Sequence, residues 1–129
     1  MMCNNSIQRQ TISNEELYTM MCKETEKGRT VCHIRGRLCN TLDYFFREVS
    51  AALRFPYYFG WNWNAFDECM TDLEWMNVSS LLIVFDDYSL MTKNADFCGD
   101  NEIWLQRHIR YFVEYWINAG IDIQVILNR

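Results

Sequence analysis

The chain has 129 residues, half of them apolar and 16% aromatic, which is enough for one hydrophobic core and predicts a single domain. With a formal net charge of −5 and no run of 18 apolar residues, the sequence disfavours direct binding of nucleic acid and excludes a transmembrane helix. Its six cysteines form no C-x-x-C pair and no signal peptide precedes them, so we expect reduced thiols, no structural zinc site and a cytoplasmic protein.

The N-terminal residues differ in character from the rest of the chain. The first 12 residues are polar and show no periodicity, so they are predicted to form a loose tail. Good helix formers from Asn14 to Thr25 predict a short helix that ends before Gly28. We therefore expect an N-terminal extension over residues 1–29 and a main domain over residues 30–129.

One strand and two helices are predicted next. The stretch from Thr30 to Arg35 is rich in strand formers and ends at a glycine, which predicts the first strand. Asn40 or Thr41 can cap a helix, and apolar residues from Leu42 onward at spacings of three and four predict that it continues to Arg54, closed by Pro56. Asn62 is expected to cap a second helix. The apolar stripe of that helix consists of Trp63, Phe66, Met70 and Leu73.

The C-terminal half alternates strand, helix and strand. The apolar run from Leu81 to Phe85 predicts a strand covered on both faces. After a loop, helical periodicity extends from Ile103 to Ala119, and Asp122 to Leu127 predicts the last strand. With right-handed crossovers, this order predicts an α/β fold in which helices cover a small three-stranded parallel sheet in three layers, α/β/α.

The sequence contains no recognisable catalytic motif. It lacks the dinucleotide and P-loop glycine signatures, H-E-x-x-H and G-x-S-x-G. His33 falls in a strand, where a hydrogen-bonded or edge histidine is expected, and His108 is flanked by two arginines, which is typical of a solvated face. Asp67, Glu68 and Asp72 have no neighbouring base or phosphate clamp. We expect no enzyme activity, no cofactor and no metal.

The negative charge is concentrated in one segment. Between Phe55 and Thr92, six acids and no Lys or Arg give −6, whereas 11 acids and 12 bases give the remainder +1. The six acids are Asp67, Glu68, Asp72, Glu74, Asp86 and Asp87. Such a segment repels phosphate backbones and attracts a basic partner, although an ordinary solvated acidic face would have the same charge.

Two tryptophans flank this acidic row when Trp61 to Trp75 is projected as one helix. The face opposite the apolar stripe holds Trp61, Asn64, Glu68, Asp72 and Trp75, with Thr71 beside them and Asp67 toward the flank. Tryptophan beside acidic side chains is typical of the centre of a protein interface. The alternative is that the N-terminal tail or the loop after Phe85 covers these rings.

The run PYYFGWNWNAFDECMTDL, residues 56–73, resembles the central motif of barstar and the barstar-like ribonuclease inhibitors. The ending YWINAGIDIQVILNR, residues 115–129, is similar to the last helix, turn and final parallel strand of that family. The resemblance extends roughly from Val31 to Leu127. It implies an inhibitor that sits over a ribonuclease active site in a 1:1 complex, with acidic side chains in the place of substrate phosphates.

The resemblance also implies a binding surface on the second helix and the aromatic loop before it. Together with the helical projection, it gives one set of predicted partner-binding residues. They are Tyr58, Trp61, Asn62, Asn64, Asp67, Glu68, Thr71, Asp72 and Trp75. The chain departs from the family pattern. The family's two key helix aspartates are replaced by Asn64 and Glu68, and the family's tryptophan between them is replaced by Asp67. An acidic residue of the family's last long helix is replaced by Tyr115.

The leading hypothesis is therefore an immunity protein that neutralises a toxin nuclease by occluding its basic active site. The alternative is an interaction module on the same scaffold that binds a partner other than a ribonuclease. Occlusion of a basic cleft predicts association that slows as salt rises, whereas an apolar interface centred on Trp61 and Trp75 would be far less sensitive.

Overall fold

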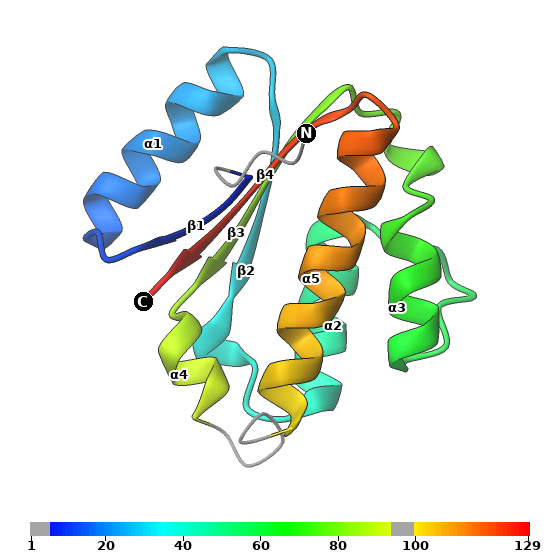
Figure 1. The fold of residues 1–129 in the computed structure, drawn as a ribbon. Helices are drawn as coiled ribbons and strands as arrows, with labels where there is room; N and C mark the ends of the chain where they lie inside the picture. Colours follow the sequence, from blue (N-terminus) through cyan, green and yellow to red (C-terminus); the bar gives the residue numbers. More distant parts are fainter. Residues whose placement is uncertain (1–5, 94–99) are drawn as a thin grey trace.

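The computed structural model of the chain describes residues 6–93 and 100–129, and its fold is an α/β arrangement around a parallel sheet (Figure 1). The strands are β1 (Ile7–Gln10), β2 (Thr30–Arg35), β3 (Ser80–Asp86) and β4 (Asp122–Asn128). The α-helices are α1 (Asn14–Glu26), α2 (Leu42–Leu53), α3 (Trp63–Met70), α4 (Tyr88–Thr92) and α5 (Asp100–Asn118). Two short 3-10 helices, η2 (Gly36–Leu38) and η3 (Glu74–Met76), complete the order.

The sheet has four strands in the order β1-β4-β3-β2, so the prediction of three strands was wrong. The additional strand lies within the segment that was expected to be a loose tail, where β1 pairs in parallel with β4 from Ile7 opposite Val125 to Gln10 opposite Asn128. The sequence IQRQ has no run of β-branched residues, and its stability as a strand depends on hydrogen bonds to β4 at the edge of the sheet.

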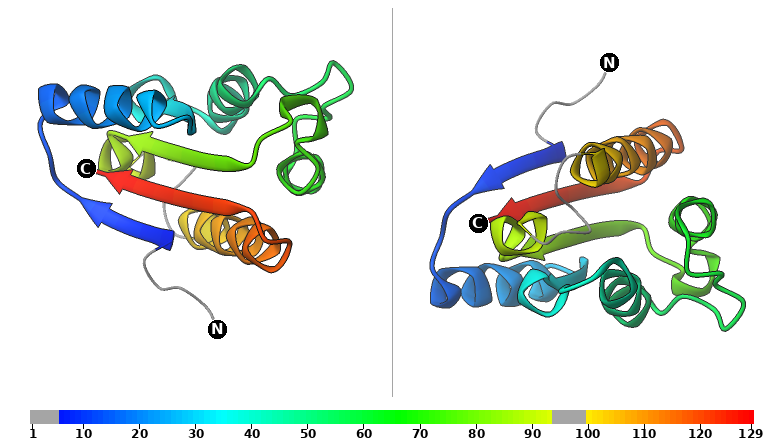
Figure 2. Two further views of the ribbon diagram at one scale, coloured as in Figure 1. Left: turned by 90° about the horizontal axis from the view of Figure 1, so that it is seen from above. Right: turned by 90° about the horizontal axis from the view of Figure 1, so that it is seen from below.

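Helices cover both faces of the sheet unequally. Figure 1 and Figure 2 show α1 alone on one face and α2 and α5 on the other, with α3 outermost beyond them. On the α1 face, Leu17 packs in a small buried cluster with Leu82, Val84 and Ile126. The larger core lies between the sheet and the other helices. The domain boundary after residue 29 stays a prediction, but β1 and α1 share a sheet and a core cluster with the rest.

Local signals explain where the helices begin and where the chain turns. The hydroxyls of Ser13 and Thr41 accept hydrogen bonds from backbone N–H groups in the first turns of α1 and α2. Gly36 follows β2 where a Cβ would come within 2.4 Å of the carbonyl oxygen of Asp86, so only glycine fits. Gly120, at φ +82°, allows the turn from α5 into β4.

The segment after β3 contains helix α4, where the sequence predicted only a loop. Residues 94–99 of that predicted loop lie outside the described residues. Across the described part of the chain, no helix is long and apolar enough to cross a membrane, and no group of three or more His, Cys, Asp or Glu side chains is arranged to hold a metal ion.

Candidate protein-binding surface

The loop between α2 and α3 is a turn held by two buried phenylalanines. Phe55 and Phe59 pack edge to face with ring centroids 4.9 Å apart, and the Phe59 N–H donates to the Pro56 carbonyl at 3.0 Å. Of the three residues between these phenylalanines, Tyr57 and Tyr58 are exposed. Burial of the phenylalanines therefore fixes the turn that presents the two tyrosines.

Asn62 caps α3, as the sequence predicts. Its Oδ1 accepts from the Ala65 N–H at 2.8 Å, and its Nδ2 donates to the Gly60 carbonyl at 3.1 Å. Trp61, just before it, has a left-handed backbone with φ +57° and an exposed ring. Because the Asn62 amide is bonded to Gly60 of the loop and to Ala65 of α3, it sets the start of the helix and the direction of Trp61.

Helix α3 ends at Met70, so the projection of one helix as far as Trp75 was wrong. The Thr71 hydroxyl donates back to the Asp67 carbonyl at 2.7 Å, and Leu73 is buried with a left-handed backbone at φ +44°. This reversal turns Trp75 inward, where its Nε1 donates to the Leu53 carbonyl at 2.9 Å. Trp75 is therefore half-buried against the core rather than on the outer face that the projection gave it.

Three carboxylates lie exposed around Tyr58. Glu68, Asp72 and Glu74 come from α3, the turn after it and η3, and all are exposed. Partial desolvation, followed by interactions with Asp72, Cys69, Glu74 and Glu68 in that order, raises the pKa of the Tyr58 phenol. The structure thus brings the acidic side chains of two short helices together beside an exposed tyrosine. Asn64 is exposed on the same helix as Glu68.

A cation lies beside the exposed Trp61 ring, although the acidic segment of the sequence contains no Lys or Arg. The Arg47 guanidinium of α2 lies 5.7 Å from the centre of the Trp61 ring and 5.9 Å from that of Tyr44. Sequence reasoning missed this neighbour because Arg47 precedes the acidic segment. Only the packing of α2 beside the loop places it there.

Asp67 points toward α5 instead of into solvent. Its Oδ1 lies 2.6 Å from Nδ1 of His108, and the two side chains are 27% and 11% exposed. The imidazole stacks on Trp63 with ring centroids 4.5 Å apart and planes 4° apart. The prediction that His108 lies on a solvated face was therefore wrong, because the contact with α3 buries it. The expectation for His33 holds, since its Nε2 lies 3.3 Å from Oδ2 of Asp86.

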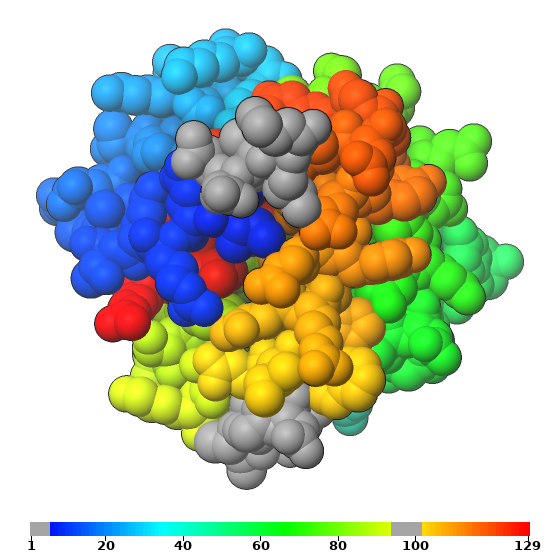
Figure 3. All heavy atoms as spheres, in the orientation of Figure 1, coloured from blue at the N-terminus to red at the C-terminus, as the bar shows by residue number. Residues whose placement is uncertain are grey.

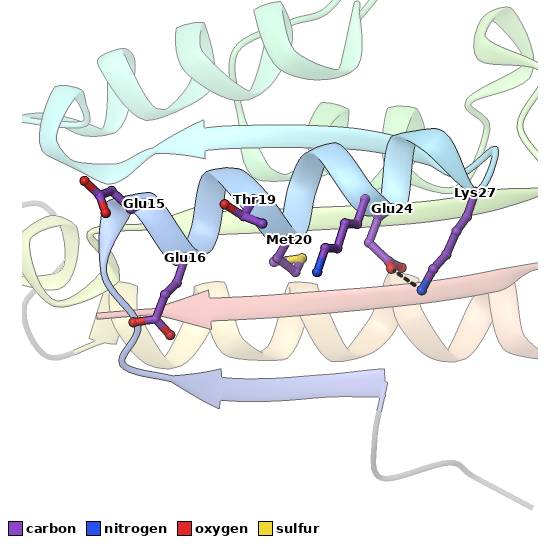
Figure 4. Close-up of a pocket in the computed structure, with 7 residues that line it drawn as sticks. Glu15, Glu16, Thr19, Met20, Glu24 and Lys27 are labelled. Atoms are coloured by element: carbon purple, nitrogen blue, oxygen red, sulfur yellow. Dashed lines mark hydrogen bonds and ion pairs between the residues drawn. The ribbon is translucent and has the colours of Figure 1, made fainter.

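A shallow groove lies elsewhere, beside α1, and Figure 4 shows side chains of that helix along it. Its lining residues are Glu15, Glu16, Thr19, Met20, Lys23, Glu24 and Lys27. Both acids and lysines line it, and Lys27 is paired with Glu24 at 3.0 Å. None of the predicted binding residues lines this groove, which is on the face of the sheet opposite α3.

Comparison with known families identifies the scaffold. The family model described as Barstar (barnase inhibitor) matches residues 29–128, more than three quarters of the chain. The chain belongs to the barstar family. Membership in this family suggests a protein-binding role similar to that of a barnase inhibitor. The matched region holds the acidic surface but excludes β1 and α1. No curated protein matches the chain.

Proposed function

We propose that this barstar-family chain is an immunity protein that inhibits a toxin ribonuclease by covering its basic active site with α3, η3 and the aromatic loop. The single observation that carries the proposal is the group of exposed carboxylates Glu68, Asp72 and Glu74 around Tyr58. It supports binding of a cationic protein surface, and the family match supports a ribonuclease as that partner.

The mechanism requires no chemistry from the inhibitor. A ribonuclease binds the phosphates of RNA with Lys, Arg and His side chains, so a surface that carries carboxylates competes for the same cleft. Opposite charges accelerate the encounter, and close pairing inside the complex slows dissociation. The barnase and barstar pair is the standard measured case of this behaviour. The complex proposed here has one inhibitor per nuclease and forms in the cytoplasm.

The predicted binding residues divide into two groups in this proposal. Tyr58, Trp61, Asn64, Glu68 and Asp72 are exposed and are assigned direct contacts. Asn62, Asp67, Thr71 and Trp75 make hydrogen bonds within the chain, and we assign them to positioning the loop and α3. Glu74, which was not in the predicted set, joins the first group because it is exposed and close enough to affect Tyr58.

The experiment is a titration of the purified chain into a fluorogenic RNA cleavage assay with a panel of bacterial toxin ribonucleases. We expect stoichiometric loss of cleavage with at least one enzyme, and at least tenfold weaker inhibition by Glu68→Ala, since close charge pairs contribute about 1.5 kcal/mol or more. Glu26→Ala, which removes an exposed acid at the end of α1, is the matched control and should inhibit normally.

Salt separates electrostatic occlusion from an apolar interface. The association rate should fall steeply as ionic strength rises, and the slope should be smaller for Glu68→Ala than for Glu26→Ala. An association rate that does not change with ionic strength would contradict occlusion of a basic cleft. Stable binding to a panel member without loss of cleavage would instead identify an interaction module that does not inhibit.

A further inference from the structure

Trp61 is an exposed residue that the chain nevertheless holds in one position. Its side chain is 47% exposed, yet its ring contacts Phe59 with centroids 5.5 Å apart, and Phe59 in turn packs edge to face on Phe46 of α2. The backbone of Trp61 is left-handed at φ +57°, a conformation that is costly for a bulky residue and persists only where the surroundings enforce it. Contacts that lead back to α2 therefore fix the Trp61 ring.

Arg47 of α2 lies against two exposed rings. Its Cζ atom is 5.7 Å from the centre of the Trp61 ring and 5.9 Å from that of Tyr44. Within residues 6–93 and 100–129, no carboxylate forms an ion pair with Arg47. Asp43, four residues earlier on the same helix, is at a spacing typical of such pairs, but the guanidinium lies against the rings instead. The charge of Arg47 is therefore available to another molecule.

Stacking on a ring prepares a guanidinium to bind a carboxylate. The ring covers a face of the group, while the N–H donors around its edge can bind both oxygens of a carboxylate. Because the rings hold the group before the partner arrives, less side-chain entropy is lost when the pair forms. Tryptophan, tyrosine and arginine are also the residues enriched among those that dominate binding energy at interfaces. Arg47 with its two rings is thus a prepared site for a carboxylate of the partner.

The charge of Arg47 is opposite to that of the acidic segment. Residues 55–92 hold six acids and no Lys or Arg, which suits a basic cleft. A cation beside Trp61 is repelled by a basic residue of the partner placed opposite it and stabilised by an acidic one. Specificity between related partners commonly includes such a repulsive element. Arg47 can therefore distinguish ribonucleases by the charge that each carries at one place.

We propose that Arg47 is a specificity-determining residue, and that its guanidinium, held against Tyr44 and Trp61, pairs with a carboxylate at the rim of the ribonuclease cleft. This inference rests on the proposed function, in which Trp61 contacts the partner. The carboxylates of α3 and η3 speed association with any sufficiently basic cleft, and Arg47 then favours the enzymes that carry an acid opposite it.

The experiment measures the dissociation constant of the complex with a ribonuclease that the unmodified chain inhibits. Arg47→Gln should bind at least about tenfold more weakly, because a close charge pair is lost. Arg47→Lys keeps the charge but loses the planar set of donors, and should bind only about threefold more weakly. Lys23→Gln is the matched control for the loss of one positive charge. It alters α1, on the side of the molecule away from α3 (Figure 3), and should bind as tightly as the unmodified chain or slightly more tightly.

The direction of the effect tests the pair. Against a partner that is basic throughout the contact, loss of a cation from the inhibitor strengthens binding. If Arg47→Gln binds as tightly as the unmodified chain, or more tightly, the pair is overturned while the proposed function stands. Equal weakening by Arg47→Lys and Arg47→Gln would assign Arg47 to holding Trp61 and would also overturn the pair. If no ribonuclease of the panel is bound, the proposed function fails and this inference fails with it.

The specificity role is tested on panel ribonucleases that the unmodified chain binds more weakly. Arg47→Gln should weaken these complexes less than the preferred one, or strengthen them, so that the ratio of affinities falls. An unchanged ratio would overturn the specificity role. The urea midpoint of each variant serves as the control for folding, and it should not change because Arg47 and Lys23 are exposed.

Discussion

The Asp67 carboxylate on α3 and the His108 imidazole on α5 lie 2.6 Å apart, from Oδ1 to Nδ1, across 41 residues of sequence. The contact is part of a stack, because Trp63 covers the imidazole. The His108 Nε2 is buried without a hydrogen-bond partner in the described part of the chain. This pairing is one of the contacts that hold α3 against α5, together with the hydrogen bond from Trp116 Nε1 to the Met70 carbonyl at 2.6 Å.

Replacing Asp67 by Ala should destabilise the fold by about 2 kcal/mol, because both nitrogens of a mostly buried imidazole would then lack a partner. The measurement is the free energy of unfolding in urea. Inhibition of a partner ribonuclease should fall less than with Glu68→Ala, since Asp67 is assigned a positioning role. Unchanged stability would show that the Asp67 contact does not hold α3 in place.

Trp75→Phe should cost about 1 kcal/mol, because it removes the hydrogen bond from Nε1 to the Leu53 carbonyl but keeps an aromatic ring beside Phe55. The matched change is Trp61→Phe, at an exposed ring that should leave stability within about 0.5 kcal/mol of the unmodified chain. If chemical denaturation shows that Trp75→Phe and Trp61→Phe lower the free energy of unfolding equally, the inward placement of Trp75 is contradicted.

Leu17→Ala should destabilise the whole sheet by roughly 3 kcal/mol, because Leu17 is the buried residue through which α1 covers Leu82, Val84 and Ile126. Tyr18→Ala, at the neighbouring exposed position, should have little effect. Unfolding followed by tryptophan fluorescence reports on the main core, since every tryptophan lies outside α1. If Leu17→Ala leaves that transition unchanged, residues 6–28 form an independent extension.

Glu48→Gln should lose less stability in acid than the unmodified chain does. Burial opposes ionisation of Glu48, but hydrogen bonds from the Arg35 guanidinium and backbone N–H outweigh it and lower the Glu48 pKa. A lowered folded pKa stabilises above the unfolded value, about 4.3, and this stabilisation disappears as pH falls through the folded pKa. Urea unfolding at neutral pH and at about pH 3.5 measures this. If the difference in unfolding free energy between the unmodified chain and Glu48→Gln does not become smaller in acid, the proposed role of the Glu48 carboxylate is contradicted.

Native thiol labelling should distinguish Cys22 from the buried cysteines. The four described cysteines form no disulfide. Burial raises the pKa of Cys32 to about 11 and, with the Glu48 charge, that of Cys39 to about 12. Since the thiolate is the reactive form, Cys32 and Cys39 should stay unlabelled near pH 8 while Cys22 reacts. Peptide mass mapping identifies the labelled residues. Early labelling of Cys32 would indicate local opening of β2.

The sequence determined the elements whose signals are local. The strand Thr30–Arg35 was predicted with its exact ends, and α2 (Leu42–Leu53) ends one residue before the predicted end at Arg54. The caps at Asn62 and the turn at Gly120 were also predicted. In each case the residues that decide the structure lie within one or two helical turns, or along one strand, so their pattern is visible in the sequence.

Tertiary structure alone decided β1, the end of α3 and the surroundings of His108. The strand β1 forms because its backbone pairs with β4, which lies more than 100 residues away in sequence. Trp75 points inward because the Leu53 carbonyl accepts its hydrogen bond, and His108 is buried because Trp63 and Asp67 cover it. Periodicity records which face of an element is apolar. The partners that these residues meet, and therefore the extent of the acidic surface, depend on contacts between distant segments, which periodicity does not encode.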